Sequence, residues 1–244
     1  MYNPATETLE QLNIGQLQFI QPKRGYRFSV DAVLLADFLY VKPDECLIDL
    51  GTGTGIIPLL SAVLTPACEI VGLELQDRLA NLAKQNVSIN ALDHRIRIMQ
   101  GDLKQVSQLF RAGEFDVLCS NPPYRRVGTG RMNPGAEQAI ARHEIACSLD
   151  DLLAACKYLV KPGGKVFLIY LPERLNELLV GLNTYRLEPK RIRCVHTSEN
   201  TTASLALIEA QRDAGAGLTI LPPLFLYTQE NVYSTEAKRI LHEK

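Results

Sequence analysis

The sequence has no excess charge of either sign and no long apolar run. Its 244 residues include 26 lysines and arginines and 27 aspartates and glutamates, which gives a formal net charge of −1. A nearly neutral chain needs a local basic patch to bind nucleic acid. No stretch approaches the roughly 20 apolar residues of a membrane span, and residues 1–12 lack the basic-then-apolar pattern of a signal peptide. We therefore expect a cytoplasmic protein without membrane contact.

The sequence also lacks a cysteine pattern for a metal site or a disulfide framework. No two of its six cysteines are spaced as C-x-x-C; they are Cys46, Cys68, Cys119, Cys147, Cys156 and Cys194. Such scatter predicts reduced cysteines in the core and no bound metal. Internal repeats, low-complexity linkers and an obvious catalytic histidine or cysteine dyad are missing as well.

Length and composition indicate one α/β domain. Hydrophobic residues make up 46% and charged residues 22%, as in soluble globular proteins. The length allows one sizeable domain and is too short for two of ordinary size. We expect a single domain over residues 1–244, with a catalytic core at 46–212, an N-terminal extension at 1–45 and a C-terminal extension at 213–244.

From Cys46 onward, short apolar runs alternate with helix-like stretches, which predicts a parallel sheet with helices on both faces. The expected strands are 46–50, 69–73, 96–100, 115–120 and 165–171. Helical spacing of apolar residues predicts helices at 56–64, 77–89, 150–160 and 173–185. We expect the glycines of Lys161–Gly164 to end the third of these helices and turn the chain into the next strand.

Two strand-like runs, 191–196 and 203–211, leave no room for a helix between them and predict an antiparallel hairpin at the sheet edge. Five parallel strands followed by such a hairpin resemble the Rossmann-like, seven-stranded sheet of class I methyltransferases. A dinucleotide oxidoreductase more often continues with another βαβ unit. Outside this core we expect an edge strand or hairpin at 17–21 and helices at 30–40 and 235–242.

A buried strand at 47–50 runs into a glycine-rich turn. Asp49, Gly51, Gly53 and Gly55 are spaced as Asp-x-Gly-x-Gly-x-Gly, which differs from the dinucleotide pattern G-x-G-x-x-G. Glycines let the backbone come close to a ligand. A carboxylate before the turn would repel a pyrophosphate, whereas it suits the ammonium group of an amino acid, bound directly or through water.

Carboxylates also follow the next two strands. Glu74 is placed to accept hydrogen bonds from both hydroxyls of a ribose, and Asp102 to accept one from an adenine amino group. Either acid alone could equally be a helix cap or a solvated charge. Three acids at consecutive strand ends predict a nucleoside with an amino-acid tail, which is S-adenosylmethionine.

The fourth strand enters Asn121-Pro122-Pro123-Tyr124 directly. An exocyclic amino group is a poor nucleophile because its lone pair is delocalised, so the protein must accept both amino hydrogens to orient the nitrogen for in-line attack. The Asn121 side-chain oxygen and the Pro122 carbonyl are predicted to do this, with the prolines holding that carbonyl outward. Pro123 and Tyr124 are predicted to contact a planar substrate, which stacks on the Tyr124 ring. Asn121, Pro122 and Tyr124 are thus the candidate catalytic residues, and Asn121 also borders the cofactor.

The loop at 125–147 is too long for a mere connection, and its charge is net positive. Arg125, Arg126 and Arg142 are candidate substrate contacts. Together with other basic residues they could grip RNA phosphates, the alternative being a solvated surface. These other residues are Lys23, Arg24, Lys190, Arg191 and Arg193.

The sequence resembles the bacterial methyltransferases that modify N6 of the adenine next to the anticodon in valine tRNA, together with close relatives. The resemblance rests on five segments: Gly25–Leu35, Asp49–Gly55, Asn121–Tyr124, Ala141–Glu144 and Pro222–Leu224. It implies tRNA as partner, S-adenosylmethionine as cofactor, and an N-terminal extension that folds over the cofactor with Ser29 as a contact.

Three alternatives remain open at this point. Guanine-N2 methylation of ribosomal RNA uses similar chemistry, and no residue separates it cleanly from adenine-N6 methylation. An N5-glutamine methyltransferase acting on a release factor uses the same four-residue motif, but such enzymes resemble this chain less because they carry a larger helical N-terminal domain. A non-catalytic RNA-binding module with the same fold would not need the full set of acids and Asn121.

Overall fold

One mixed β-sheet forms the centre of the protein, as seen in a computed structural model that describes residues 2–24, 27, 29–67, 69–122, 147–229 and 232–242. The strand order is β10-β8-β9-β7-β6-β3-β4-β5, and β11 also pairs with β8. The strands are β3 (Cys46–Leu50), β4 (Glu69–Glu74), β5 (Ile96–Gln100), β6 (Phe115–Ser120), β7 (Val160–Tyr170), β8 (Leu187–His196), β9 (Ala203–Arg212), β10 (Thr219–Ile220) and β11 (Leu224–Phe225).

The seven longer strands have the predicted class I methyltransferase arrangement. Strands β7, β6, β3, β4 and β5 run parallel. Strand β9 is antiparallel to β7, and β8 is antiparallel to β9. The predicted hairpin is therefore confirmed, but it is not the outermost element, because β10 and β11 each pair in parallel with β8. These two strands have only two residues each, too few for the alternation that reveals a strand in sequence.

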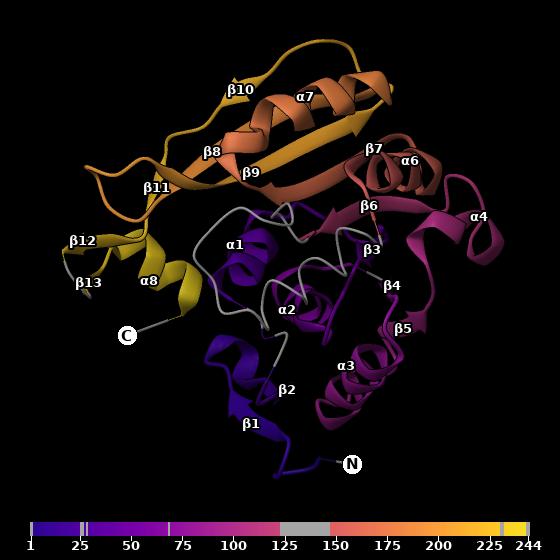
Figure 1. Ribbon diagram of the computed structural model, residues 1–244, viewed down its shortest axis with the longest axis vertical. Coiled ribbons are helices and arrows are strands. Elements are labelled where there is room, and N and C mark those ends of the chain that lie inside the picture. Colours follow the sequence, from indigo (N-terminus) through magenta and orange to yellow (C-terminus); the bar gives the residue numbers. More distant parts are fainter. Residues whose placement is uncertain are drawn as a thin grey trace.

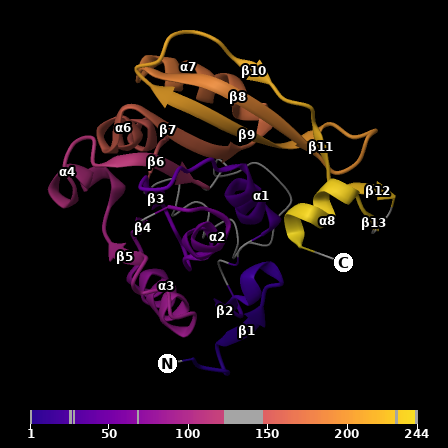
Figure 2. The ribbon, with the colours of Figure 1, turned by 180° about the vertical axis from the view of Figure 1, so that it is seen from behind.

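Helices cover both faces of the sheet (Figures 1 and 2). Alternate residues of β3 point to opposite faces, so Leu47 packs in one apolar cluster and Ile48 in the other. The first cluster holds residues of α1 (Val30–Phe38), α2 (Ile56–Leu64) and α3 (Asp77–Ile89). The second holds residues of α4 (Val106–Leu109), α6 (Leu149–Leu159) and α7 (Leu175–Thr184). Short 3-10 turns are η1 (Ile14–Gln16), η2 (Leu103–Gln105) and η3 (Pro172–Arg174).

The predicted limits of α2 and α3 match the structure, whereas the end of α6 differs. Helix α6 ends at Leu159, and the segment 160–164 already belongs to β7. The pairing of β6 with β7 jumps from Phe115 opposite Val160 to Val117 opposite Lys165, so the glycines lie in a bulge. A Cβ atom at Gly164 would lie 2.7 Å from the Asp116 carbonyl oxygen. The glycines thus permit close strand contact and do not end the helix.

Both ends of the chain pack against the helices of one face. Strand β1 (Glu7–Gln11) pairs with β2 (Gln18–Pro22) as a separate antiparallel hairpin, which lies beside α3 (Figure 1). Near the other end, β12 (Tyr227–Gln229) pairs with β13 (Val232–Tyr233), and α8 (Thr235–Leu241) packs against α1. The α8–α1 contact includes an ion pair between Arg239 and Asp37 at 3.1 Å.

In the described parts of the chain, no helix is long and apolar enough to cross a membrane. The five cysteines that the structure describes are free thiols, and Cys119 and Cys156 are buried in the core as predicted, whereas Cys46, Cys147 and Cys194 are only partly buried. Among the same residues, no group of three histidine, cysteine or acidic side chains is arranged to hold a metal ion. Cys68 lies outside the described residues.

Candidate active site

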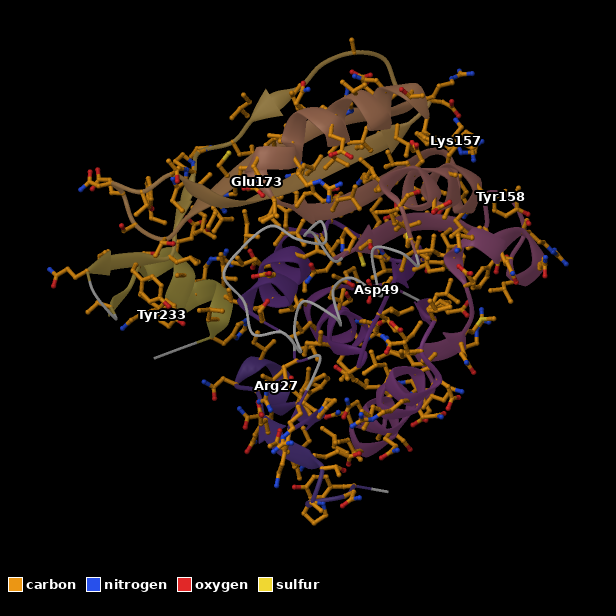
Figure 3. The ribbon with its side chains drawn as sticks, viewed as in Figure 1. Arg27, Asp49, Lys157, Tyr158, Glu173 and Tyr233 are labelled. Atoms are coloured by element: carbon orange, nitrogen blue, oxygen red, sulfur yellow. The ribbon has the colours of Figure 1, made fainter. Side chains whose placement is uncertain are left out.

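A cavity of about 240 Å³ lies at the carboxyl ends of β3, β4, β5 and β6. The chain crosses from β3 to β4 and β5 on one side and to β6 and β7 on the other, and ligands of α/β sheets bind at such a switch point. Figure 3 shows Asp49 near the middle of the fold and Arg27 toward the N-terminal hairpin. Apart from its apolar residues, the cavity is lined by the glycines Gly51, Gly53 and Gly101 and by Arg27, Ser29, Asp31, Glu74, Asp102, Ser120, Asn121 and Cys147.

The glycine turn forms one wall of this cavity. Gly51, Gly53 and Gly55 have φ values of 73°, 59° and 84°, which L side chains rarely adopt. A Cβ atom at Gly51 would meet no described atom within 4 Å, so this glycine faces open space. A Cβ atom at Gly55 would instead lie 3.0 Å from the Cβ atom of Ala83. Gly51 thus leaves room for a ligand, whereas Gly55 lets the turn pack closely on α3.

Glu74 connects the glycine turn to the end of β4. Its side chain is almost fully buried, and Oε2 accepts a hydrogen bond from the Gly53 N–H at 2.9 Å. The other oxygen, Oε1, accepts one from the Gln76 N–H at 2.9 Å. Since each carboxylate oxygen has two lone pairs, Glu74 can hold the turn and still accept hydrogen bonds from a ligand in the cavity.

Asp102 caps a helical turn, which is one of the roles that its sequence position left open, and it also lines the cavity. It is the N-cap of η2, where Oδ1 accepts a hydrogen bond from the Lys104 N–H at 2.9 Å. Its other oxygen, Oδ2, lies 3.9 Å from the Lys104 ammonium nitrogen. The cap fixes the side chain in place, so its second oxygen has a defined position at the end of β5.

Asp49 lies behind the glycine turn and is not among the residues that line the cavity. Its side chain is fully buried, and the Cys119 thiol lies 3.6 Å from Oδ1. Oδ2 has no well-formed hydrogen bond within the described chain, although the nearby Thr52 side chain favours the ionised form. Burial outweighs these contacts and raises the pKa of Asp49 to about 7, with a further contribution from the charge of Glu74.

The segment before α1 supplies three residues to the cavity. Ser29, the N-cap of α1, lines it as the resemblance implied, and Arg27 and Asp31 line it without having been predicted. Burial raises the pKa of the Asp31 carboxyl, opposed by a hydrogen bond from the Ser29 side chain. The Arg27 guanidinium pairs with Glu10 of β1 at 2.5 Å. The N-terminal hairpin therefore fixes a cation at the cavity.

Asn121 and Pro122, directly after β6, also line the cavity. The preceding Ser120 donates a hydrogen bond from Oγ to the Leu50 carbonyl at 2.7 Å. This bond ties the end of β6 to the end of β3, and so places Asn121 beside the glycine turn. The structure thereby brings the two predicted motifs, which are 70 residues apart, to one cavity.

Residues 27–170 match the family model described as methyltransferase small domain. A protein of Porphyromonas gingivalis named tRNA1(Val) (adenine(37)-N6)-methyltransferase is 30% identical over 92% of this chain and 91% of its own length. The chain therefore belongs to the methyltransferase family that this model describes, as its similarity to this relative over most of its length also indicates. A predicted O-methyltransferase from Agrobacterium tumefaciens has the same fold, with a TM-score of 0.72 and 20% identity over 87% of this chain and 95% of its own. So does a Streptomyces coelicolor geranyl diphosphate C-methyltransferase solved with S-adenosyl-L-homocysteine, with a TM-score of 0.55 and 18% identity over 75% and 78% of the two chains.

The remaining predicted substrate contacts of the methyltransferase lie outside the described residues. These are Pro123, Tyr124, Arg125, Arg126 and Arg142, and with them the Ala141–Glu144 segment. Cys147, where the description resumes, lines the cavity. Burial raises the pKa of its thiol to about 11, which favours the protonated form at neutral pH.

Basic residues at the sheet edge of the methyltransferase already have partners within the chain. Arg191 pairs with Glu209, and Arg193 pairs with Glu236 of α8 at 2.8 Å. The Lys190 ammonium group donates a hydrogen bond to the Gly215 carbonyl at 2.9 Å. The first contact joins β8 to β9, and the other two hold the C-terminal extension to β8. They favour a structural role over the predicted grip on phosphates for all three residues.

We expect Asp49→Asn to flatten the pH dependence of folding stability of the unliganded methyltransferase. The pKa of Asp49 is about 7 in the fold and about 4 in an unfolded chain, so the folded state holds the proton more tightly. Stability should be full below pH of about 4 and fall as the pH rises to about 7. Each pKa unit is worth about 1.4 kcal/mol, and with relaxation of the fold we expect a loss of about 2 kcal/mol.

Urea unfolding at pH 5 and pH 8 measures this difference. Asp49→Asn should lose less stability than the wild type between these two values, whereas Asp93→Asn, at an exposed acid, should behave as the wild type. An unchanged slope in Asp49→Asn would show that Asp49 is ionised throughout.

Proposed function

We propose that this methyltransferase transfers a methyl group from S-adenosylmethionine to N6 of an adenine in tRNA. The observation that carries the proposal is the meeting of Asn121 and Pro122 with Gly51, Glu74 and Asp102 on one cavity. An amino-accepting motif beside a nucleoside site is what methylation of an exocyclic amine requires. The choice of adenine in tRNA is supported by the relatives that are named for this activity.

The charged and apolar residues that line the cavity suit S-adenosylmethionine. The cofactor has an ammonium, a sulfonium and a carboxylate group, and the described lining has the acids Asp31, Glu74 and Asp102 with Arg27 as its one cation. Gly51 leaves space at the turn. Leucine side chains add apolar walls suited to an adenine ring; they are Leu50, Leu73, Leu75, Leu79, Leu103 and Leu152. When bound, the cofactor supplies a methyl group already activated by the sulfonium charge.

We assign each polar residue a part of the cofactor. Glu74 binds the ribose hydroxyls, and Asp102 binds the adenine amino group. Arg27 pairs with the carboxylate, with Ser29 beside it. Asp49 lies behind the turn, and it attracts the ammonium group either across the backbone of Gly51 and Gly53 or through a bridging water. These assignments use the carboxylate positions described above and the 5% exposure of Glu74, which leaves its charge little screened by solvent.

The chemistry at the amino group is mainly orientation. The Asn121 side-chain oxygen and the Pro122 carbonyl accept the two amino hydrogens, and the nitrogen lone pair is then directed at the methyl group. The Tyr124 ring supports the base by stacking. The amine becomes acidic only as the methyl arrives, so no strong general base is needed and its proton can leave to water. Arg125, Arg126 and Arg142 would then contact the RNA chain.

The relatives that are named for adenine methylation favour this function over methylation of a protein glutamine. Guanine-N2 methylation uses the same amino chemistry and is distinguished from adenine-N6 methylation by its product.

We expect incubation with labelled S-adenosylmethionine to place label in N6-methyladenosine of tRNA. The enzyme is given tRNA, ribosomal RNA and protein fractions from a bacterial lysate, and mass spectrometry identifies the modified nucleoside. The Asn121→Ala variant under the same conditions is the control for a contaminating enzyme. Label found only in protein, or as N2-methylguanosine, would overturn the proposal.

A further inference from the structure

Asn86 of α3 makes three hydrogen bonds in the protein interior. Its side chain is fully buried, and Oδ1 accepts a hydrogen bond from the Ile20 N–H at 2.7 Å. Its Nδ2 donates to the Ile20 carbonyl at 2.9 Å and to the Thr54 carbonyl at 2.9 Å. Ile20 lies in β2 and Thr54 in the glycine turn. One side chain therefore joins the N-terminal hairpin to the cofactor turn.

Only an amide side chain in this orientation can form hydrogen bonds with all three of these partners. Two of them are carbonyl oxygens and one is an N–H group, so the Asn86 amide nitrogen must face Ile20 O and Thr54 O. A carboxylate here would place an oxygen against two carbonyls. An apolar side chain would leave three buried polar groups without a partner, each of which costs stability.

The same three elements also pack through apolar contacts. Ile20 of β2 forms a small buried cluster with Leu79 and Leu82 of α3, and Leu79 lines the cofactor cavity. One turn before Asn86, Ala83 packs against Gly55 of the glycine turn. The hairpin, α3 and the glycine turn therefore pack together as one continuous unit. The chain leaves β2 to reach Arg27 and Ser29, which line the same cavity.

Asn90 provides a natural comparison one helical turn further along α3. Its Oδ1 accepts a hydrogen bond from the Gln18 N–H at 2.9 Å, and its Nδ2 donates to the Gln18 carbonyl at 2.7 Å. Asn90 therefore binds β2 as Asn86 does, but its side chain bonds to Gln18 and to the Asn86 carbonyl instead of the glycine turn, and its bonds to Gln18 are exposed to solvent.

We propose that Asn86 is a positioning residue for cofactor binding. It fixes the Thr54 carbonyl, and with it the shape of the glycine turn. It also sets the hairpin, whose Glu10 pairs with Arg27, against that turn. It touches neither cofactor nor substrate. The inference rests on the proposed use of S-adenosylmethionine. By the reciprocity of coupled equilibria, a ligand at the turn must then stabilise the docked hairpin.

Kinetics of Asn86→Ala and Asn90→Ala test the role of the Thr54 contact. We expect Asn86→Ala to raise KM for S-adenosylmethionine about tenfold, which corresponds to about 1.4 kcal/mol, because the Thr54 carbonyl loses its buried hydrogen bond, and to leave kcat within about twofold at saturation. Asn90→Ala should leave both constants within about twofold. Equal changes in the two variants, or a fall in kcat alone for Asn86→Ala, would overturn the proposal. Thermal unfolding shows whether each variant is folded.

Hydrogen exchange of the wild-type chain tests the coupling without any substitution. S-adenosyl-L-homocysteine should slow exchange of the Ile20 amide, which donates to Asn86, at least about threefold, in addition to the amides of the glycine turn. Slower exchange at the turn with none at Ile20 would refute the coupling while leaving the proposed function intact. If the ligand neither protects the turn nor binds by calorimetry, the proposed cofactor itself is wrong, and the inference falls with it.

Discussion

Replacing Asn121 by alanine should lower kcat about 100-fold or more and leave the Kd for S-adenosylmethionine within about threefold. The side-chain oxygen of Asn121 is the proposed acceptor for one amino hydrogen, and its removal leaves the nitrogen lone pair delocalised and poorly directed. The backbone of β6, including the Ser120 bond to Leu50, is unaffected, so the cavity keeps its shape. Single-turnover methylation of tRNA gives the rate, and calorimetry with S-adenosyl-L-homocysteine gives the affinity.

The matched control is Asn200→Ala, because Asn200 is an exposed asparagine in the loop between β8 and β9. It should keep full activity and affinity. If Asn121→Ala retained more than about a tenth of the wild-type rate, which corresponds to about 1.4 kcal/mol of barrier, Asn121 would not be the amino acceptor. A large loss of affinity at an unchanged rate would instead make Asn121 a cofactor contact only.

The central fold could be predicted because its signals are local and periodic. Strands β3 and β6 are short apolar runs at the predicted limits, and α3 has apolar residues at helical spacing from Asp77 to Ile89. The bulge at 160–164 could not be predicted in this way. Glycines after a helix usually mark its end, whereas here the reason for Gly164 is the nearby Asp116 carbonyl, which belongs to another strand.

The cavity was predictable where its residues follow strands, as Glu74 and Asp102 do. Arg27 and Asp31 could not be assigned from residue types alone, because only the folding of the N-terminal segment brings them to the strand ends. The resemblance over 25–35 was the one signal for that segment. Asp49 shows the opposite case, since its motif is easily recognised but its buried position behind the turn is visible only in three dimensions.

Substitution of Glu74 by glutamine should weaken binding of S-adenosylmethionine about 100-fold. Both carboxylate oxygens accept backbone hydrogen bonds, from Gly53 and from Gln76, so an amide nitrogen in either place faces an N–H donor. The ribose hydroxyls would also lose one acceptor and the negative charge. Hydrogen bonds to charged groups contribute about 1.5–3 kcal/mol each, so losing one and distorting the turn accounts for a change of this size.

Glu69→Gln is the control for this substitution, because Glu69 is an exposed carboxylate at the opposite end of the same strand, paired with Arg97 at 3.4 Å. It should bind the cofactor as the wild type does. Calorimetry gives the affinity, and activity at saturating cofactor should return to within about threefold of the wild type for Glu74→Gln. That recovery distinguishes cofactor binding by Glu74 from orientation of the amino group by Asn121, because no cofactor concentration should restore the activity of Asn121→Ala. Affinity within about threefold of the wild type in Glu74→Gln would remove Glu74 from the ribose site and leave it only the role of holding Gly53.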